Sequence, residues 1–318
     1  MVITQVAEPS GMANDIRRQN LRSLMLFLLS CGEMTKLDLL RRSGLSNTTV
    51  SESINNLLAL GVVRKAGTQK STGGRQPTVY SINNNFGSFL GIQIEQRIIK
   101  ITGTDMQARP MYRKMVVLSE ERSLLHTLCG AIEEARDTIA AATLALALGF
   151  PGRLDVRHGI VLTSEISNWR NVPIKEILER RFNILTVVDS KVNQGTLYQQ
   201  VLGIAQHIEN FICYFTEAPE QAALVMEGRL CRGDENACCV SLGDSAPIAR
   251  LASLATMLSL HAVVTDVRDA EFCVRTIPIG LPDDFFEMAA ALTAEVSWFE
   301  HIYTMQLRDR RKKEGEAK

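Results

Sequence analysis

Residues 35–77 read TKLDLLRRSGLSNTTVSESINNLLALGVVRKAGTQKSTGGRQP. Gly44 separates two helical runs, at a point where the first helix must end in a left-handed conformation that glycine adopts without strain. Ser46 follows at the N-cap position of the second run, where its hydroxyl can accept a hydrogen bond from an unpaired backbone N–H. The apolar residues of both runs recur at helical spacing and are expected to form one small core: Leu37, Leu39, Leu40, Leu45, Val50, Ile54, Leu57, Leu58 and Leu60.

A basic hairpin follows the second helical run. Gly61 closes that helix, and the segments at residues 62–65 and 78–82 predict two strands joined by a loop. The loop, residues 67–76, carries Lys70 and Arg75 and no acidic residue. Two helices, a tight turn and a basic hairpin together predict a winged helix-turn-helix.

The exposed surface of this unit suits double-stranded DNA. Short polar side chains at the start of the second helix fit base edges and phosphates in a major groove, and a cationic loop can reach phosphates or a narrow minor groove. The alternative is a helical hairpin that only packs, with a solvated charged loop. The residues expected to contact DNA are Thr35, Ser46, Asn47, Thr48, Thr49, Ser51, Lys70, Gly73, Gly74, Arg75 and Gln76.

The charge of the chain is unevenly distributed. The 318 residues include 35 Lys plus Arg and 35 Asp plus Glu, so the net charge is zero. Residues 1–83 hold ten basic and five acidic residues, a net charge of +5, which leaves 25 basic and 30 acidic residues, or −5, for the remainder. We therefore expect only the first segment to meet a polyanion.

Length and composition indicate a chain of two or three globular domains, with 46% hydrophobic and 22% charged residues. No early segment resembles a signal peptide, and the apolar run at residues 139–148 is too short to span a bilayer. Seven scattered cysteines, an odd number, are expected to be reduced thiols. These features predict a cytoplasmic protein without a membrane partner.

Predicted strands and helices alternate after the polar residues 83–85, which indicates an α/β body with a mixed sheet. Predicted strands lie within residues 89–104, 112–118, 144–150, 184–188, 210–216, 222–226 and 261–265. Predicted helices cover residues 123–142, 172–181, 193–206, 248–258 and 281–303. We divide the chain into a flexible tail (1–13), a winged helix-turn-helix domain (14–84), an α/β body (85–306) and a charged, solvated tail (307–318).

The order of these segments resembles regulators of the ROK family, in which sugar kinases and sugar-responsive repressors share an actin-like kinase fold. In the head, the resemblance rests on GLSNTTVSESINNLLALGVV and the later GGRQP. In the body it rests on residues 146–189, which look like the family's strand, Pro-Gly turn, Asn-Trp loop, helix and strand, and on MEGRLCRG at residues 226–233 and the segment 248–266. The resemblance implies an N-terminal winged helix-turn-helix followed by an actin-like, ROK-type α/β body.

The body departs from the catalytic motifs of that family. Where the kinases have two glycine-rich phosphate turns, this chain has QIEQR at residues 93–97 and EAPEQ at residues 217–221, whose carboxylates would repel phosphate. The resemblance places Lys191 where the kinases carry the base that deprotonates the sugar hydroxyl, and a protonated lysine cannot do this. Asp189 is either a displaced base or a capping or surface group. We expect no catalytic residue.

Metal and ligand sites are also reduced. The family's zinc site uses one His and three closely spaced Cys, whereas this chain offers Cys231 and the adjacent Cys238 and Cys239, with no nearby histidine. We expect no metal and no cofactor. Asn168 and Trp169 lie in a loop that resembles a sugar-contacting loop of the family, and either they hold a sugar or Trp169 anchors the loop to the core. Asn193 is either a retained ligand contact or a helix cap.

These observations favour a transcriptional regulator, a repressor in carbohydrate metabolism, that binds an inverted-repeat operator as a homodimer and responds to a sugar-type effector. One alternative is a sugar kinase with a DNA-binding head. The other is a regulator whose body is a protein-interaction platform without a small ligand.

Overall fold

The structure, a computed structural model, describes residues 12–69, 76–119, 123–164, 166, 168–218, 220–232, 240–242, 247–258, 260–267 and 275–316. Most of the predicted N-terminal tail lies outside this part of the chain. So do the loop residues Lys70, Gly73, Gly74 and Arg75, and the cysteines Cys238 and Cys239.

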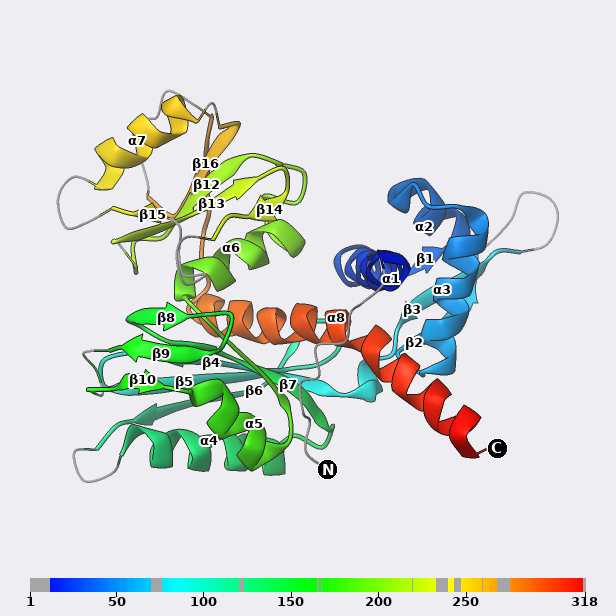
Figure 1. Ribbon diagram of the computed structural model, residues 1–318. Helices are drawn as coiled ribbons and strands as arrows, with labels where there is room; N and C mark the ends of the chain where they lie inside the picture. Colours follow the sequence, from blue (N-terminus) through cyan, green and yellow to red (C-terminus); the bar gives the residue numbers. More distant parts are fainter. Residues whose placement is uncertain are drawn as a thin grey trace.

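The N-terminal unit has the elements of a winged helix-turn-helix (Figure 1). Its three helices are α1 (Met12–Cys31), α2 (Lys36–Ser43) and α3 (Asn47–Ala59). Its strands β1 (Met34–Thr35), β2 (Val63–Thr68) and β3 (Thr78–Ile82) form an antiparallel sheet in the order β1-β3-β2. This is the architecture that residues 35–77 predict.

Local residues end and begin these helices as expected. Gly44 closes α2 with a left-handed φ of 65°, and Ser46 caps α3 by accepting a hydrogen bond from the backbone N–H of Thr49 at 3.1 Å. Leu39, one of the predicted core residues, is fully buried, but Leu37 is 53% exposed. The two leucines are only two residues apart, so a helix turns them to different faces.

The body begins after a short 3-10 helix, η1 (Asn84–Phe86), with a five-stranded sheet in the order β11-β7-β4-β5-β6. Strands β7 and β11 run parallel to β4. On the other side of β4, β5 is antiparallel to β4 and β6 is antiparallel to β5. Helices α4 and α5 cover one face and α8 the other (Figure 1). The bounds are β4 (Ser88–Ile94), β5 (Ile98–Thr104), β6 (Pro110–Val117), α4 (Leu124–Thr138), β7 (Thr143–Gly149), α5 (Ile174–Phe182), β11 (Leu185–Asp189) and α8 (Phe285–Glu316).

A second lobe contains a mixed sheet in the order β14-β13-β12-β16-β17, with β15 paired to β13. Its strands lie between α7 and α6 (Figure 1). The bounds are α6 (Lys191–Val201), β12 (Phe211–Tyr214), β13 (Gln221–Met226), β14 (Arg229–Leu230), β15 (Val240–Ser241), α7 (Pro247–Met257), β16 (Ala262–Thr265) and β17 (Arg275–Pro278). A small antiparallel sheet, β10-β9-β8, lies in sequence between β7 and α5 of the first lobe and comprises β8 (Arg153–Asp155), β9 (Ile160–Thr163) and β10 (Arg170–Val172).

Helix α8 connects all parts of the molecule. It packs against β4 and β7 of the first sheet, against α6 and against α1 of the head (Figure 1). Trp298 on α8 lies 5.7 Å from the ring of Phe86 and 5.8 Å from that of Phe89, and the same core includes Leu24 and Leu57 of the head. Helix α8 continues to Glu316, beyond the predicted end of the last helix at residue 303.

Substitution of Gly91 tests how closely α8 lies on the sheet. A Cβ atom at Gly91 would come within 2.0 Å of the carbonyl oxygen of Glu287 and 2.3 Å of the backbone N of Ala291. We expect Gly91→Ala to lower the free energy of unfolding by about 3 kcal/mol or more, since helix backbone cannot move aside locally. The measurement is equilibrium urea denaturation followed by circular dichroism.

Gly130→Ala is the matched control. Gly130 is exposed within α4, and a Cβ there would meet no atom within 4 Å. Alanine should raise the free energy of unfolding by about 0.5–1 kcal/mol because of its higher helix propensity. Equal effects of the two substitutions would contradict the close packing of α8 on β4.

Candidate functional site

The start of α3 presents polar side chains to solvent. Asn47 and Thr48 are exposed, and Ser51, one turn later, is half-buried and donates a hydrogen bond to the carbonyl oxygen of Asn47 at 2.6 Å. The hydroxyls of Ser46 and Thr49 lie 2.8 Å apart and stabilise the first turn. Asn47 and Thr48 are therefore exposed to a partner, on a helix start that the hydrogen bonds of Ser46 and Thr49 stabilise.

Thr35 has a different role from the one predicted. Its side chain is almost completely buried and accepts a hydrogen bond from the N–H of Asp38, while the Asp38 carboxylate accepts from the backbone N–H of Thr35 at 2.9 Å. This reciprocal arrangement is a capping box at the start of α2. Because the hydroxyl is engaged there, we remove the Thr35 side chain from the set that can contact DNA.

Further basic residues flank α3. Arg41 and Arg42 are exposed in the last turn of α2, and Arg64 and Lys65 are exposed on β2. At the base of the loop, Thr68 donates to the side chain of Gln76 at 2.8 Å, so Gln76 braces the two strands. The two arginines of α2 were missed as contact candidates, although their position directly before the Gly44 turn places them close in sequence to the start of α3.

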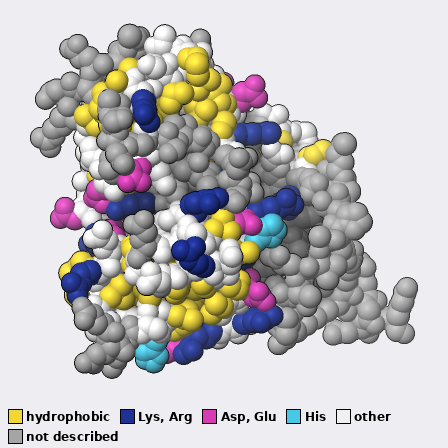
Figure 2. All heavy atoms as spheres, turned by 60° about the vertical axis from the view of Figure 1, so that its left-hand side comes forward, with side chains coloured by type: hydrophobic (Ala, Val, Ile, Leu, Met, Phe, Trp, Pro, Cys, Tyr) yellow, Lys and Arg dark blue, Asp and Glu magenta, His cyan; other side chains and the backbone are white. Residues whose placement is uncertain are grey.

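The body carries an ion cluster at the place where the kinase motifs should lie. Lys191, at the start of α6, lies 3.3 Å from Glu95 after β4 and 2.5 Å from Glu217 after β12. Lys100 on β5 lies 3.0 Å from the same Glu95 oxygen and 3.8 Å from Glu287 of α8. Figure 2 draws one face of the molecule, and Lys and Arg side chains lie beside Asp and Glu side chains across its middle.

The pKa values of the acids in and near the cluster are shifted in opposite directions. Burial raises the pKa of Glu95, but hydrogen bonds and attraction from Lys100 and Lys191 outweigh it, so this pKa lies below its ordinary value. Burial raises the pKa of Glu287. Attraction from Lys100 lowers it by less, so the pKa lies above its ordinary value. Burial also raises the pKa of Glu295, two turns further along α8, well above its ordinary value. Glu95 is thus the anion that the two lysines hold.

Asp189 is fully engaged by its neighbours. Arg232 binds it with two nitrogens at 3.2 and 2.7 Å, Asn193 donates to it at 2.8 Å, and the backbone N–H of Ser190 donates at 2.7 Å. The Asp189 side chain is only 4% exposed. A carboxylate held by a bidentate guanidinium and two further donors is neither a surface group nor an available base.

The three predicted sugar-contacting residues have different surroundings. Trp169 stacks on Phe150, with ring centroids 5.1 Å apart and an interplanar angle of 17°, which favours the core anchor. Asn168 is exposed and has a left-handed φ of 52°. Asn193 is buried, and its amide nitrogen is used by Asp189. Of these three residues, Asn168 alone is exposed to solvent.

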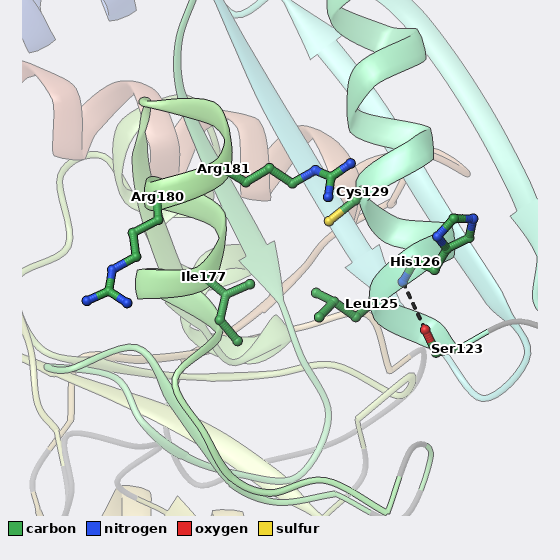
Figure 3. A pocket seen from close by; sticks show the side chains of 7 residues that line it. All are labelled: Ser123, Leu125, His126, Cys129, Ile177, Arg180 and Arg181. Carbon is green, nitrogen blue, oxygen red and sulfur yellow. Dashed lines mark hydrogen bonds between the residues drawn. The ribbon is translucent and has the colours of Figure 1, made fainter. Parts of the chain in front are cut away.

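A surface cavity of about 540 Å³ lies between α4 and α5 (Figure 3). Arg181 points towards Cys129 there, whereas Arg180 points away. Both arginines are already paired, Arg181 with Glu133 at 2.8 Å and Arg180 with Glu176 at 2.5 Å. Burial raises the pKa of the Cys129 thiol, which disfavours a reactive thiolate. We assign no function to this cavity.

Neither a metal cluster nor a membrane helix is found in the described part of the chain. Among its residues, no three His, Cys, Asp or Glu side chains are grouped so that they could hold a metal ion. Cys231 is a half-exposed free thiol. None of the described helices combines the length and the apolar composition needed to span a bilayer.

Comparisons with known proteins relate the chain to one protein family. The ROK family model matches residues 90–238. The xylose repressor of Caldicellulosiruptor bescii is 27% identical over 195 residues, which cover 59% of this chain and 49% of the repressor. A crystal structure of a ROK family transcriptional regulator, a homologue of the Escherichia coli MLC protein, superposes with a TM-score of 0.70 at 13% identity, covering 92% of this chain and 98% of that one.

A kinase has the same body fold. The ROK family glucokinase of Streptomyces griseus, solved with glucose and AMPPNP, superposes with a TM-score of 0.53 at 14% identity, covering 65% of this chain and 99% of the glucokinase. This chain spans about half the length of the curated relatives it matches, from 41% to 58%. The fold of the body and the match over residues 90–238 agree: the chain carries a domain of the ROK family.

Proposed function

We propose that this chain is a DNA-binding transcriptional repressor of the ROK type. The observation that carries the proposal is the winged helix-turn-helix head, in which Asn47 and Thr48 stand exposed on a well-capped α3. The net charge of +5 over residues 1–83 supports the same partner, because basic residues supply most non-specific affinity for DNA. The name of the similar xylose repressor agrees with this function.

We propose the functional division suggested by the sequence, with a DNA-binding unit at residues 14–84 and a ROK body at residues 85–306. Two copies, joined through their bodies, would place two α3 helices about one DNA turn or a multiple apart and read an inverted repeat. The contacts we propose are those of Ser46, Asn47, Thr48, Thr49 and Ser51 on α3, Arg41 and Arg42 on α2, and Lys70, Gly73, Gly74, Arg75 and Gln76 in the hairpin.

We also propose that the body is catalytically inactive. The ion cluster supports this, because Lys191 stands in the place that resembles the catalytic base of the kinases and is held between two carboxylates. The family resemblance implies that these carboxylates, Glu95 and Glu217, stand at the two phosphate turns. Phosphorylation of glucose or xylose by the purified protein at ordinary turnover would contradict this assignment.

The role left for the body is sensing, and we propose a sugar-type effector. The alternative is a platform for another protein, without a small ligand. A thermal-shift panel of sugars separates the two, because a ligand that binds only the folded state raises the melting temperature.

Arg75→Ala tests the DNA-binding proposal. We expect the affinity for a DNA fragment selected by the chain from a random library to fall about tenfold, and the dependence of log affinity on log salt to become shallower by about one unit. The physical reason is the loss of one cation at a phosphate or in the minor groove. Gel shifts at several salt concentrations provide the measurement.

Arg180→Ala is the control for this change. It removes the same charge from the body, where the Arg180 side chain is 78% exposed. Both the affinity and the salt slope should stay as in the parent chain. If Arg75→Ala behaves like Arg180→Ala, the basic hairpin does not contact DNA.

Lys191→Met tests the ion cluster. Removal of the ammonium leaves Glu95 and Glu217 without their shared partner, and we expect the free energy of unfolding at pH 7 to fall by about 1–2 kcal/mol. Because Lys191 contributes to the lowered pKa of Glu95, that stabilisation is present at neutral pH and is lost as the pH falls through the lowered value. The difference between the two proteins should therefore narrow towards about pH 3.

Urea denaturation at both pH values measures this difference, with Lys65→Met as the control because Lys65 is exposed on β2. A Lys191→Met protein as stable as the parent at pH 7 would show that the cluster contributes nothing to folding.

A further inference from the structure

A second cavity lies where the head meets the body. Its volume is about 480 Å³, within the range of about 300–1,000 Å³ that is usual for small-molecule sites. Arg22 and Leu26 of α1 line it from the head, and Gln200 of α6 lines it from the body. The loop after α6 and the turn between β13 and β14 complete its walls, so a ligand there would touch both units.

Hydrogen bonds within the body hold these walls in shape. Gln200 donates through Nε2 to the carbonyl oxygen of Gly228 at 3.1 Å, and the N–H of Gly228 donates to the carbonyl of Glu209 at 2.8 Å. Gln199 accepts from the N–H of Ile204 at 3.2 Å and so fastens the loop after α6. A site preformed in this way loses little ordering entropy when a ligand binds.

The lining combines apolar surface with uncharged donors and acceptors. Leu26 and Leu197 supply apolar carbon, while Gln200 and His207 supply groups that can both donate and accept hydrogen bonds. A pyranose ring presents the same combination, since its hydroxyls donate and accept while its C–H face is apolar.

The charges at the cavity disfavour an anion. Among the described residues that line it, Arg22 supplies the guanidinium, whose Nε lies 3.0 Å from the carboxylate of Glu300 on α8. Glu209 adds an exposed carboxylate to the rim. A phosphorylated or carboxylated ligand would find its cation already paired and a like charge nearby.

We propose that this cavity between α1 and α6 is the effector site and that it takes a neutral monosaccharide. The inference rests on the proposed function, because it names where a sensing body would receive its signal. The equivalent of the kinase cleft is a weaker candidate, since Asp189, Asn193 and Lys191 are engaged with other side chains there.

A ligand in this seam acts on the head directly. It contacts α1, which belongs to the DNA-binding head, and α6, which belongs to the body, so it favours the head–body arrangement that makes both contacts. The affinity for DNA then changes by the ratio of the ligand's affinities for the DNA-competent arrangement and the alternative arrangement.

Calorimetric titration of the full chain with xylose, glucose and glucose 6-phosphate tests the proposal. We expect xylose or glucose to bind and glucose 6-phosphate to bind more weakly. Gln200→Leu removes a donor and acceptor, and His207→Trp fills the mouth of the cavity from an exposed loop position. Each should weaken sugar binding at least about tenfold.

Two control variants separate this cavity from the rest of the chain. Gln19→Leu lies on the exposed face of α1, and Asn168→Ala removes the sugar contact suggested by the family resemblance. Gln19→Leu should bind the sugar within about twofold of the parent, and Asn168→Ala decides between the two candidate sites, since binding through the cavity between α1 and α6 would survive it. Loss of binding in Asn168→Ala with retention in Gln200→Leu and His207→Trp would overturn the joint site.

Two further results of the titration would also contradict the proposal. Tighter binding of glucose 6-phosphate than of the free sugars overturns the assignment to a neutral ligand, and absence of binding by xylose and glucose overturns the site. DNA binding of each unliganded variant, measured by gel shift, reports on the proposed function separately. A chain that binds DNA but no sugar retains its function as a repressor and refutes only this inference.

Discussion

The close contact of α8 with β4 at Gly91 sets the positions of the two lobes and the head. Only glycine allows the carbonyl of Glu287 and the backbone of Ala291 to lie directly over that strand. The same helix then packs on α6 and, through Trp298, on the residues that lead into the head. A shift of α8 along the sheet would therefore disturb three interfaces at once, and close-packed interfaces resist such gradual displacement.

The ion cluster joins residues that the family resemblance places at the phosphate turns and at the catalytic base of the kinases. The family resemblance places Glu95 and Glu217 where backbone N–H groups would meet phosphate, and two carboxylates there would repel each other without a cation between them. Lys191 supplies that cation from the position of the catalytic base. If these positions correspond as the resemblance implies, one lysine both replaces the base and neutralises the two carboxylates.

Local patterns were sufficient to predict the head, because caps, turn glycines and apolar spacing act within a few residues. Ser46 and Gly44 took their expected positions, and most strands of the body were placed within a few residues. The errors concern two residues of α2 and its cap: Thr35 forms a capping box with Asp38, and Leu37 lies on a different helix face from the buried Leu39. The ion cluster joins residues 95, 191 and 217, and no periodicity links positions so far apart in the sequence. The contacts of the hairpin and of Asn168 with ligands stay predictions.

The shared core between head and body limits how the head can respond to the body. Leu24 and Leu57 are buried in the same cluster as Phe89 and Trp298, so separation of the units would expose a large apolar surface. A small rotation of α1 over α8 would keep this surface buried, and it would act on the cavity that α1 lines together with α6. A hundredfold preference of a ligand for one such arrangement corresponds to about 2.7 kcal/mol, which two or three hydrogen bonds across that seam can supply. The fold therefore favours tilting of an attached head over release of a tethered one.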